Sequence, residues 1–244
     1  MPPKPIASMI TAMPFPPAVG GPLDRARARF SRTWNLGKRD SLALVGPLVR
    51  RAVDLAVGTG GLLAVSPVLA ATALLVKATS PGPVLFGQER IGQHGHPFRL
   101  LKIRSMYLDA DARLASLQHL NESEGGVTFK IRRDPRITPI GRYIRKFSID
   151  ELPQLWNLVN GTMTLFGPRP PLAREVDRYG PRERRRLEVK PGITCLWQVS
   201  GRSDLSFEQQ VALDLEYIDT STTADEVRIL AKTIPAVITG KGAY

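Results

Sequence analysis

Residues 55–76 read LAVGTGGLLAVSPVLAATALLV, a run without a charged side chain. As a straight helix the run would measure about 33 Å, close to the thickness of the hydrocarbon core of one bilayer. Ser66 and Pro67 stand midway along it. A proline inside a helix removes one backbone hydrogen bond and clashes with the preceding turn. The run therefore predicts a membrane helix that is bent or broken at Ser66 and Pro67.

Basic residues flank this run on both sides, and their position bears on how the helix enters the membrane. Arg50 and Arg51 precede the run, Lys77 follows it, and the segments beyond are rich in Arg and Lys. Because positive residues favour the cytoplasmic side, both ends prefer the same side of the bilayer. A re-entrant helix-break-helix over residues 48–80 satisfies that preference. A kinked spanning helix is the alternative, because membrane helices tolerate proline and long domains can override the charge rule.

The length and charge of the chain limit the remaining interpretations. A chain of 244 residues can bury one sizeable core with appendages. Its formal net charge of +12 fits an anionic partner, either nucleic acid, an anionic membrane face or a phosphorylated substrate. Cys195 is the single cysteine, so the chain cannot form an intramolecular disulfide. This is consistent with a protein that folds in a reducing compartment.

The sequence divides into three parts. Residues 1–47 are rich in Pro, Ala and Arg without a sustained apolar period, which predicts a disordered basic tail. Residues 48–80 hold the membrane helix, and residues 81–244 are expected to form a cytoplasmic domain. Its patterns predict an α+β fold, mostly helical with short strands. We expect strands at 84–86, 98–103 and 197–199, and helices at 109–120, 152–159, 175–189, from 207 onward, and at 225–238 with a break at Pro235.

The stretch 145–153, RKFSIDELP, places two adjacent carboxylates directly after a cluster of cations. One interpretation is structural. Ser148 and Glu151 match a capping box, but that register puts Pro153 at the fifth helical position, where its missing N–H would be needed. Asp150 as the N-cap puts Pro153 in the first turn at no cost, so a plain cap at Asp150 is the structural alternative.

The other interpretation of this stretch is catalytic. An ionised and well-aimed carboxylate can be a covalent nucleophile, so Asp150 could attack phosphorus. Arg145 nearby would favour the ionised form of Asp150. Glu151 would then hold Mg²⁺, a hard cation that prefers carboxylate oxygens and bridges phosphates.

Two further cationic motifs could bind phosphate. In the tetrapeptide 167–170, Pro168 and Pro170 fix the backbone around Arg169, and a rigid guanidinium fork suits bidentate phosphate binding. A purely structural loop is the alternative. Lys102 and Arg104 lie at the end of a predicted strand, where they either line an anion site or are solvated.

These residues fall within a series of motifs in which the chain resembles the bacterial sugar transferases, the monotopic phosphoglycosyl transferases that begin exopolysaccharide and glycan assembly. The resemblance covers residues 51–244 and is to the short members, which lack additional spanning helices before this region. Each motif is weak alone, but their order is specific. The motifs are RAVD at 51, SP at 66, PGP at 81, QER at 88, KIRSM at 102, DPR at 134, DELPQ at 150, GPRP at 167, KPGIT at 190, QVSGR at 198 and GAY at 242.

The resemblance implies a reaction and an arrangement of the chain. Members of this family transfer a sugar-1-phosphate from a UDP-sugar to undecaprenyl phosphate and release UMP. The resemblance makes Asp150 the nucleophile that forms an aspartyl-phosphosugar intermediate, Glu151 the ligand of Mg²⁺, and Ser66 with Pro67 the break of a re-entrant helix. The expected substrate-binding residues are Lys102, Arg104, Arg145, Pro168, Arg169 and Pro170. Residues 81–244 would be a catalytic domain with interfacial helices on the cytoplasmic face of the inner membrane, in contact with its anionic leaflet.

Some features depart from the family pattern or stay open. Thr162 stands where members usually carry an acidic residue, Cys195 where most have glycine, and residues 220–224 lack the usual aromatic and apolar side chains. None of these changes removes Asp150 or Glu151. No residue identifies the sugar, and a homodimer is an open alternative. The alternative hypothesis is a basic module that binds nucleic acid or anionic lipid, and the arginines at 182 and 184–186 support it. No known nucleic-acid recognition motif accompanies these arginines, so we expect no nucleic-acid partner.

Overall fold

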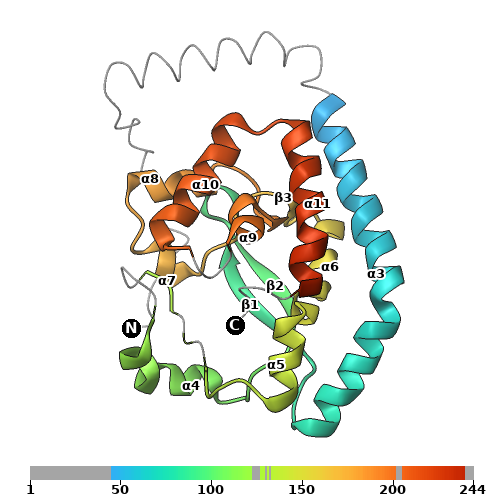
Figure 1. Cartoon of the computed structure of the whole chain (residues 1–244), viewed down its shortest axis with the longest axis vertical. Helices are drawn as coiled ribbons and strands as arrows, with labels where there is room; N and C mark the ends of the chain where they lie inside the picture. The colour runs from blue at the N-terminus through green and yellow to red at the C-terminus, as the bar shows by residue number, and fades with distance from the viewer. Residues whose placement is uncertain (1–44, 123–126, 130, 132, 202–204, 240–244) are drawn as a thin grey trace, which may run out of the picture.

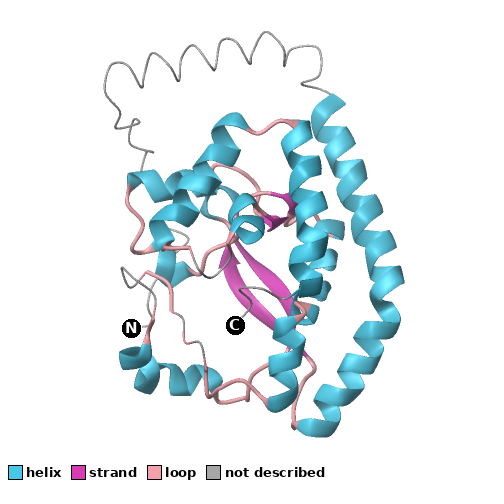
Figure 2. Ribbon diagram, viewed as in Figure 1, coloured by secondary structure: helices cyan, strands magenta, loops and turns pink. Residues whose placement is uncertain are grey.

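The computed structural model describes residues 45–122, 127–129, 131, 133–201 and 205–239. The predicted tail therefore lies almost entirely outside the described residues. Within them the fold is α+β and mostly helical, as predicted, with two small pairs of strands surrounded by helices (Figure 2). One helix, α3 (Val45–Thr79), is much longer than the others and lies along one side of the domain (Figure 1).

Helix α3 differs in one respect from the expected helix-break-helix. Helical structure continues through Ser66 and Pro67, although Figure 1 shows that the two halves of the helix run in different directions. The missing N–H of Pro67 would have bonded to the carbonyl of Leu63. The hydroxyl of Ser66 donates to that same carbonyl at 2.8 Å. Because the serine takes over this hydrogen bond, the proline bends the helix without ending it.

The first half of α3 is attached to the domain by charged side chains. The guanidinium of Arg51 donates to the carbonyls of Leu158 and Val159 at 2.5 and 2.6 Å, at the carboxyl end of α6 (Leu155–Val159). Gly58 allows α3 and α6 to pack closely, since a Cβ there would lie 2.9 Å from a methyl carbon of Val159. Asp54 is buried and accepts from the backbone of β3 (Thr164–Phe166).

The second half of α3 also contacts the domain. Val76 is 1% exposed and packs with Ile103 and Ile144 in one hydrophobic cluster. Apart from these contacts the helix keeps an exposed apolar surface. The exposed large hydrophobic residues of α3 are Leu48, Val49, Val53, Leu55, Leu63, Val68, Leu74 and Leu75. One helix that is long and apolar enough to cross a membrane is thus present within the described ranges.

The strands form two separate pairs. β1 (Leu85–Ile91) and β2 (Pro97–Ile103) form an antiparallel hairpin, in which Phe86 stands opposite Lys102. β2 matches the strand predicted at 98–103, whereas β1 extends well beyond the strand predicted at 84–86. β3 pairs in parallel with β4 (Gly192–Thr194). A second hydrophobic cluster lies between the hairpin and β3 and contains Leu100, Leu158, Met163 and Leu165.

The helices of the domain confirm some expectations and correct others. The predicted helix at 109–120 is α4 (Ala110–Leu114) followed by the 3₁₀ helix η2 (Ala115–Leu120), and the helix from 207 is α10 (Phe207–Thr220).

The prediction of one helix at 175–189 is wrong, because Gly180 and Pro181 interrupt it. The chain forms three short helices there, α7 (Ala173–Val176), α8 (Pro181–Arg184) and η4 (Arg185–Leu187). The expected strand at 197–199 is helix α9 (Leu196–Ser200). α11 (Thr223–Thr239) continues through Pro235 and is not broken there.

Candidate active site

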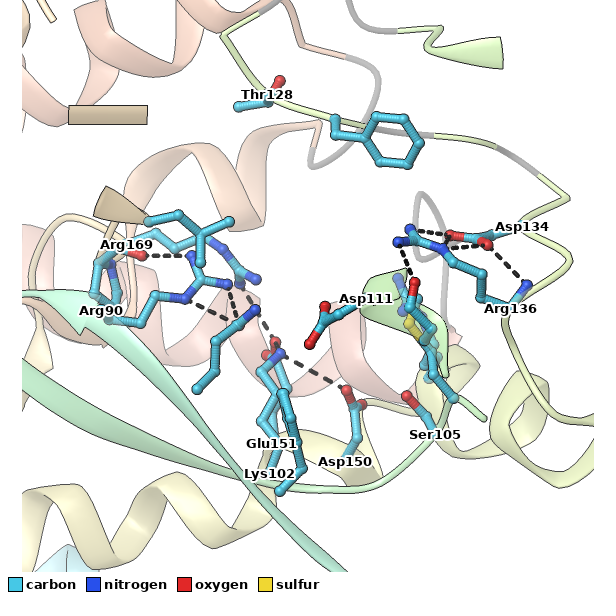
Figure 3. A pocket seen from close by; sticks show the side chains of 18 of the residues that line it. Arg90, Lys102, Ser105, Asp111, Thr128, Asp134, Arg136, Asp150, Glu151 and Arg169 are labelled. Carbon is cyan, nitrogen blue, oxygen red and sulfur yellow. Dashed lines mark hydrogen bonds and ion pairs between the residues drawn. The ribbon is translucent and has the colours of Figure 1, made fainter. Parts of the chain in front are cut away.

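The side chains singled out in the sequence meet in a cavity of about 530 Å³. Lys102, Asp150, Glu151 and Arg169 line it and point toward one another (Figure 3). They come from β2, from the 3₁₀ helix η3 (Ile149–Gln154) and from the loop after β3. Residues that are far apart in the sequence therefore converge on one site.

Helix η3 holds the two carboxylates without using either as a cap. Ser148, the residue before η3, has φ +54° and makes no capping hydrogen bond with its side chain. Asp150 lies inside η3 rather than at its N-cap, so the interpretation of Asp150 as the cap is wrong. Ser148 takes the N-cap position, but the hydrogen bond of a capping box is missing. Pro153 is accommodated because η3 is a short 3₁₀ helix that gives way to α6 at Leu155. The carboxylate of Asp150 is thus free of a structural capping role.

Cations surround the carboxylate pair. Nζ of Lys102 lies 2.9 Å from Oε1 of Glu151 and 3.7 Å from Oδ2 of Asp150. Nη1 of Arg169 lies 3.3 Å from the same Oε1 of Glu151. These pairs are partly shielded from water, so their attraction is screened less than that of fully exposed pairs.

The two adjacent carboxylates differ in their pKa. Burial raises the pKa of Asp150 above its ordinary value, and the charge of Glu151 adds to this, while Lys102, Arg145 and Arg169 oppose it. Burial also acts to raise the pKa of Glu151, but the charges and hydrogen bonds of Lys102 and Arg169 outweigh it and hold that pKa well below the usual range. Glu151 is therefore firmly ionised, and the ionisation of Asp150 depends on its cationic neighbours.

The other predicted site residues lie around the same cavity. Arg145, near the end of α5 (Pro139–Lys146), lines it, and so does Pro170. Arg104 also lines the cavity, but its guanidinium donates to the hydroxyl and carbonyl of Ser80, both at 2.9 Å, and to the carbonyl of Pro81. These bonds tie the end of β2 to the end of α3. Pro168 accepts a backbone hydrogen bond from Gly192 at 3.0 Å, and it fixes the loop rather than lining the cavity.

Two buried arginines support the loop that carries Arg169. Nη1 of Arg90 donates to the carbonyl of Pro170 at 2.8 Å. Nη2 of Arg186 donates to the carbonyl of Arg169 at 3.5 Å, and its Nε donates to the fully buried Asp214 of α10 at 2.8 Å. Burial raises the pKa of Asp214 to about 6, despite the charge of Arg186 and the contact with the Trp197 indole. None of the sequence motifs described above indicates this network.

A signal for Asp214 was present in the sequence. In α10 the apolar residues Phe207, Val211 and Leu215 share one helical face, and Asp214 falls on the same face. A charged residue on an apolar face is rarely buried without a partner. The position of Asp214 therefore indicated a buried cation beside it.

A second arginine–aspartate ion pair lines the cavity on the side away from Arg169 (Figure 3). Nη2 of Arg136 lies 2.6 Å from Oδ2 of Asp134.

The donor set fits a hard cation that is held partly by the substrate. The described residues contain no group of three or more His, Cys, Asp or Glu side chains that could hold a metal ion by themselves. Mg²⁺ commonly uses one or two carboxylates together with substrate phosphates. Both ion pairs of Glu151 in the described part of the chain use Oε1, which leaves Oε2 to serve as a ligand.

Known proteins resemble this chain over most of its length. Residues 45–240 match the family described as bacterial sugar transferase. The chain is 37% identical over 203 residues to the exopolysaccharide production protein ExoY of Rhizobium meliloti, which covers 82% of this chain and 90% of ExoY. It is 45% identical over 163 residues to the galactosyl transferase CpsE of Streptococcus agalactiae, which covers 66% of this chain but only 36% of CpsE.

A third relative is the UDP-glucose:undecaprenyl-phosphate glucose-1-phosphate transferase of Caulobacter vibrioides. It is 38% identical over 214 residues, a match that covers 82% of this chain and 76% of that protein. The family match includes α3, the dyad of Asp150 and Glu151, and the loop that carries Arg169. The chain belongs to the bacterial sugar transferase family.

Proposed function

We propose that this protein transfers a sugar-1-phosphate from a UDP-sugar to undecaprenyl phosphate. The observation that carries the proposal is the position of Asp150, a buried carboxylate beside Lys102 in a cavity lined by cations. The names of the relatives support the same substrates. An ionised carboxylate among cations matches the needs of phosphoryl transfer, which are an aligned nucleophile and positive charge around the equatorial oxygens.

The reaction has two displacements. In the first, a carboxylate oxygen of Asp150 bonds to the phosphorus that carries the sugar, and the bond from that phosphorus to the oxygen it shares with the other phosphate breaks, so UMP leaves. In the second, a phosphate oxygen of undecaprenyl phosphate bonds to the same phosphorus, and the carboxylate of Asp150 is released. The two steps conserve both charge and phosphorus, and no oxidant or reductant is needed.

The neighbouring residues serve these steps through charge. Lys102 stabilises the ionised nucleophile and, with Arg169, places positive charge near the incoming phosphates. Arg145 adds to the positive field at Asp150. Glu151 would hold Mg²⁺, which when bound neutralises phosphate charge.

The contacts of α3 favour a monotopic arrangement. Arg50, near one end, pairs with Glu226 at 2.7 Å, and Val76, near the other end, lies in the core of the domain. A helix that crossed the bilayer would place its two ends on opposite sides, where both could not contact one domain. We therefore propose that α3 enters the cytoplasmic leaflet and returns, with its exposed apolar residues in lipid and the basic residues near the anionic headgroups.

Two of the arginines that supported the nucleic-acid-binding hypothesis form ion pairs within the protein. Arg186 is buried against Asp214, and Arg185 pairs with Asp219 at 2.5 Å. They form part of the packing between η4 and α10 rather than an open basic patch.

The test is the substitution Asp150→Asn, which keeps the shape of the side chain but removes the nucleophile. UMP release from a UDP-sugar should fall by a factor of about 10³ or more, because the covalent route is lost. Asp177→Asn, at an exposed aspartate just after α7, is the matched control and should keep the parent rate. Near-parental UMP release by Asp150→Asn would refute the nucleophile assignment. So would a failure of labelled donor to leave phosphosugar on Asp150 while the acceptor is still glycosylated.

The names of the relatives refer to both galactose and glucose, so they do not assign the sugar that this protein transfers. A panel of UDP-sugars assayed for UMP release would assign it. A single preferred donor would show at least tenfold higher kcat/KM than the others, a difference of about 1.4 kcal/mol in transition-state binding.

A further inference from the structure

Exposed apolar side chains line part of the cavity that holds the carboxylate pair. Phe86, Tyr107 and Leu108 are 41%, 40% and 61% exposed, and all three line this cavity. We call these three residues the apolar rim. Large exposed apolar side chains grouped at a charged cavity are unusual and indicate a binding surface.

The hairpin register places the apolar rim beside the reacting groups. Phe86 is the cross-strand partner of Lys102, so the two side chains project from the same face of the β1–β2 ribbon. Lys102 in turn lies within 3.7 Å of Asp150. A ligand whose phosphate sits at Lys102 would therefore have its attached group next to Phe86.

The apolar rim is also close to the end of α3. The side chain of Leu108 packs over Gly82, where an added Cβ would lie 2.9 Å from Cδ2 of Leu108. Gly82 is in the short segment between Thr79, the last residue of α3, and β1. The exposed side chains of Leu74 and Leu75 lie on the last turns of α3. Exposed apolar residues thus occur on both sides of this junction, from α3 to the cavity.

We propose that the apolar rim binds the first isoprene units of the polyprenyl phosphate acceptor and so guides its phosphate to Asp150. The inference rests on the proposed function, and it adds a site for the lipid part of the acceptor. A UDP-sugar carries a uracil ring and a hydroxylated sugar on a charged diphosphate, whereas the acceptor joins a phosphate directly to a long apolar chain. The position of the apolar rim between Lys102 and the end of α3 matches that order of groups.

The experiment compares acceptors of two lengths. Phe86→Ser and Leu108→Ser each remove an exposed apolar side chain from the rim, and Val227→Ser removes one from α11, where Val227 is 62% exposed. Each protein is assayed in detergent with undecaprenyl phosphate and with a phosphate that carries two isoprene units. For both rim variants the KM for either acceptor should rise about tenfold, because the first isoprene units are common to both. Val227→Ser should keep both KM values.

Three results would overturn the proposal. The first is an unchanged acceptor KM in both rim variants. The second is an equal rise in Val227→Ser. The third is a loss of vesicle binding by the rim variants with unchanged KM in detergent, which would mean that the rim contacts the bilayer instead.

A separate readout distinguishes failure of this inference from failure of the proposed function. A polyprenyl phosphate with a photoreactive group on its first isoprene unit should crosslink to peptides that contain Phe86 or Leu108, whether or not turnover occurs. Crosslinks elsewhere would refute the rim as the chain site. Absence of UMP release from the unaltered protein without acceptor would instead refute the two-step reaction.

Discussion

The carboxylate of Asp54 accepts the backbone N–H of Leu165 at 2.8 Å, which joins the long helix α3 directly to strand β3. The same oxygen accepts from the hydroxyl of Thr164 at 3.1 Å. Strand β3 leads into the loop that carries Arg169, so an acidic residue of the helix helps to position one wall of the active site.

Replacement of Asp54 by alanine should therefore destabilise the protein. The N–H of Leu165 would lose its partner in a buried place, at a cost of about 1–3 kcal/mol. Asp54→Asn retains an oxygen acceptor and should lose less. Thermal unfolding in detergent measures both, and an equal loss in the two variants would show that the hydrogen bond to Leu165 is not the stabilising contact.

The pH dependence of the first step should report on Asp150. Burial raises the pKa of Asp150, and only the ionised carboxylate can attack phosphorus. The rate of UMP release should therefore fall with decreasing pH at a higher pH than an ordinary aspartate would give. Lys102→Met removes a charge that lowers the pKa of Asp150, so the acid limb should move to still higher pH. Lys102→Arg keeps the charge and should move it less, whereas a shift to lower pH in Lys102→Met would contradict this account.

The buried pair of Arg186 and Asp214 should behave differently in single and double variants. Either Arg186→Met or Asp214→Leu leaves one uncompensated buried charge, and we expect a loss of about 3–5 kcal/mol in the free energy of unfolding. The double variant leaves neither charge and should be more stable than both singles. Denaturant unfolding gives the three values. Additive losses would show that the two side chains are not coupled.

The sign of the pH effect on stability follows from the raised pKa of Asp214. The folded state takes up a proton near pH 6, while the unfolded state does so only near the ordinary value of 3.8. The folded state therefore binds more protons between these values, and this residue makes the protein less stable as the pH rises through that window. In Asp214→Asn that contribution should disappear from the pH dependence of unfolding.

The contributions of Ser66 and Pro67 to the stability of α3 should be coupled. Ser66→Ala leaves the carbonyl of Leu63 unpaired and should cost about 1 kcal/mol while Pro67 is present. With Pro67→Ala the backbone N–H returns, so Ser66→Ala should then cost little. Unfolding of the two single variants and the double variant tests this coupling, and an equal cost of Ser66→Ala in both backgrounds would exclude it.

The same variants test the topology. Cysteines placed at Ser8, which lies outside the described residues, and at Ser221 should both react from the cytoplasmic side. The native Cys195 is buried and should not take up the label. Pro67→Ala is expected to favour a straighter helix and to expose the two labels on opposite sides. If both labels stay cytoplasmic in that variant, Pro67 is not the element that decides the topology.

Sequence patterns predicted the local parts of the fold well. The long helix at 55–76 follows from a continuous apolar run, and the face of α10 follows from apolar residues at helical spacing, both of which are local features of one element. The segment at 175–189 was predicted wrongly because its charged residues are compatible with a helix, while Gly180 and Pro181 decide against a continuous one. The residues at 197–199 were assigned to a strand because Trp and Val favour strands, but α9 forms there through packing against α10 and α11.

Sequence motifs selected side chains that line the candidate site, but not the residues that support them. Asp150, Glu151, Lys102 and Arg169 stand in short motifs, so residue type and order were enough to select them. Arg90, Arg186 and Asp214 act through bonds between distant elements, and no local pattern contains those distances. The different roles of Lys102 and Arg104 also required the structure, because only the bonds of Arg104 to Ser80 and Pro81 separate it from its neighbour.

The packing of Val76 with Ile103 and Ile144 has a practical consequence for producing this enzyme. A water-soluble fragment that starts at residue 81 would be missing Val76 from its interior, Asp54 from β3 and Arg51 from the end of α6. Such a truncated fragment would expose apolar surface to water and aggregate during purification. Extraction of the intact chain with lipid or detergent is accordingly the route to active material.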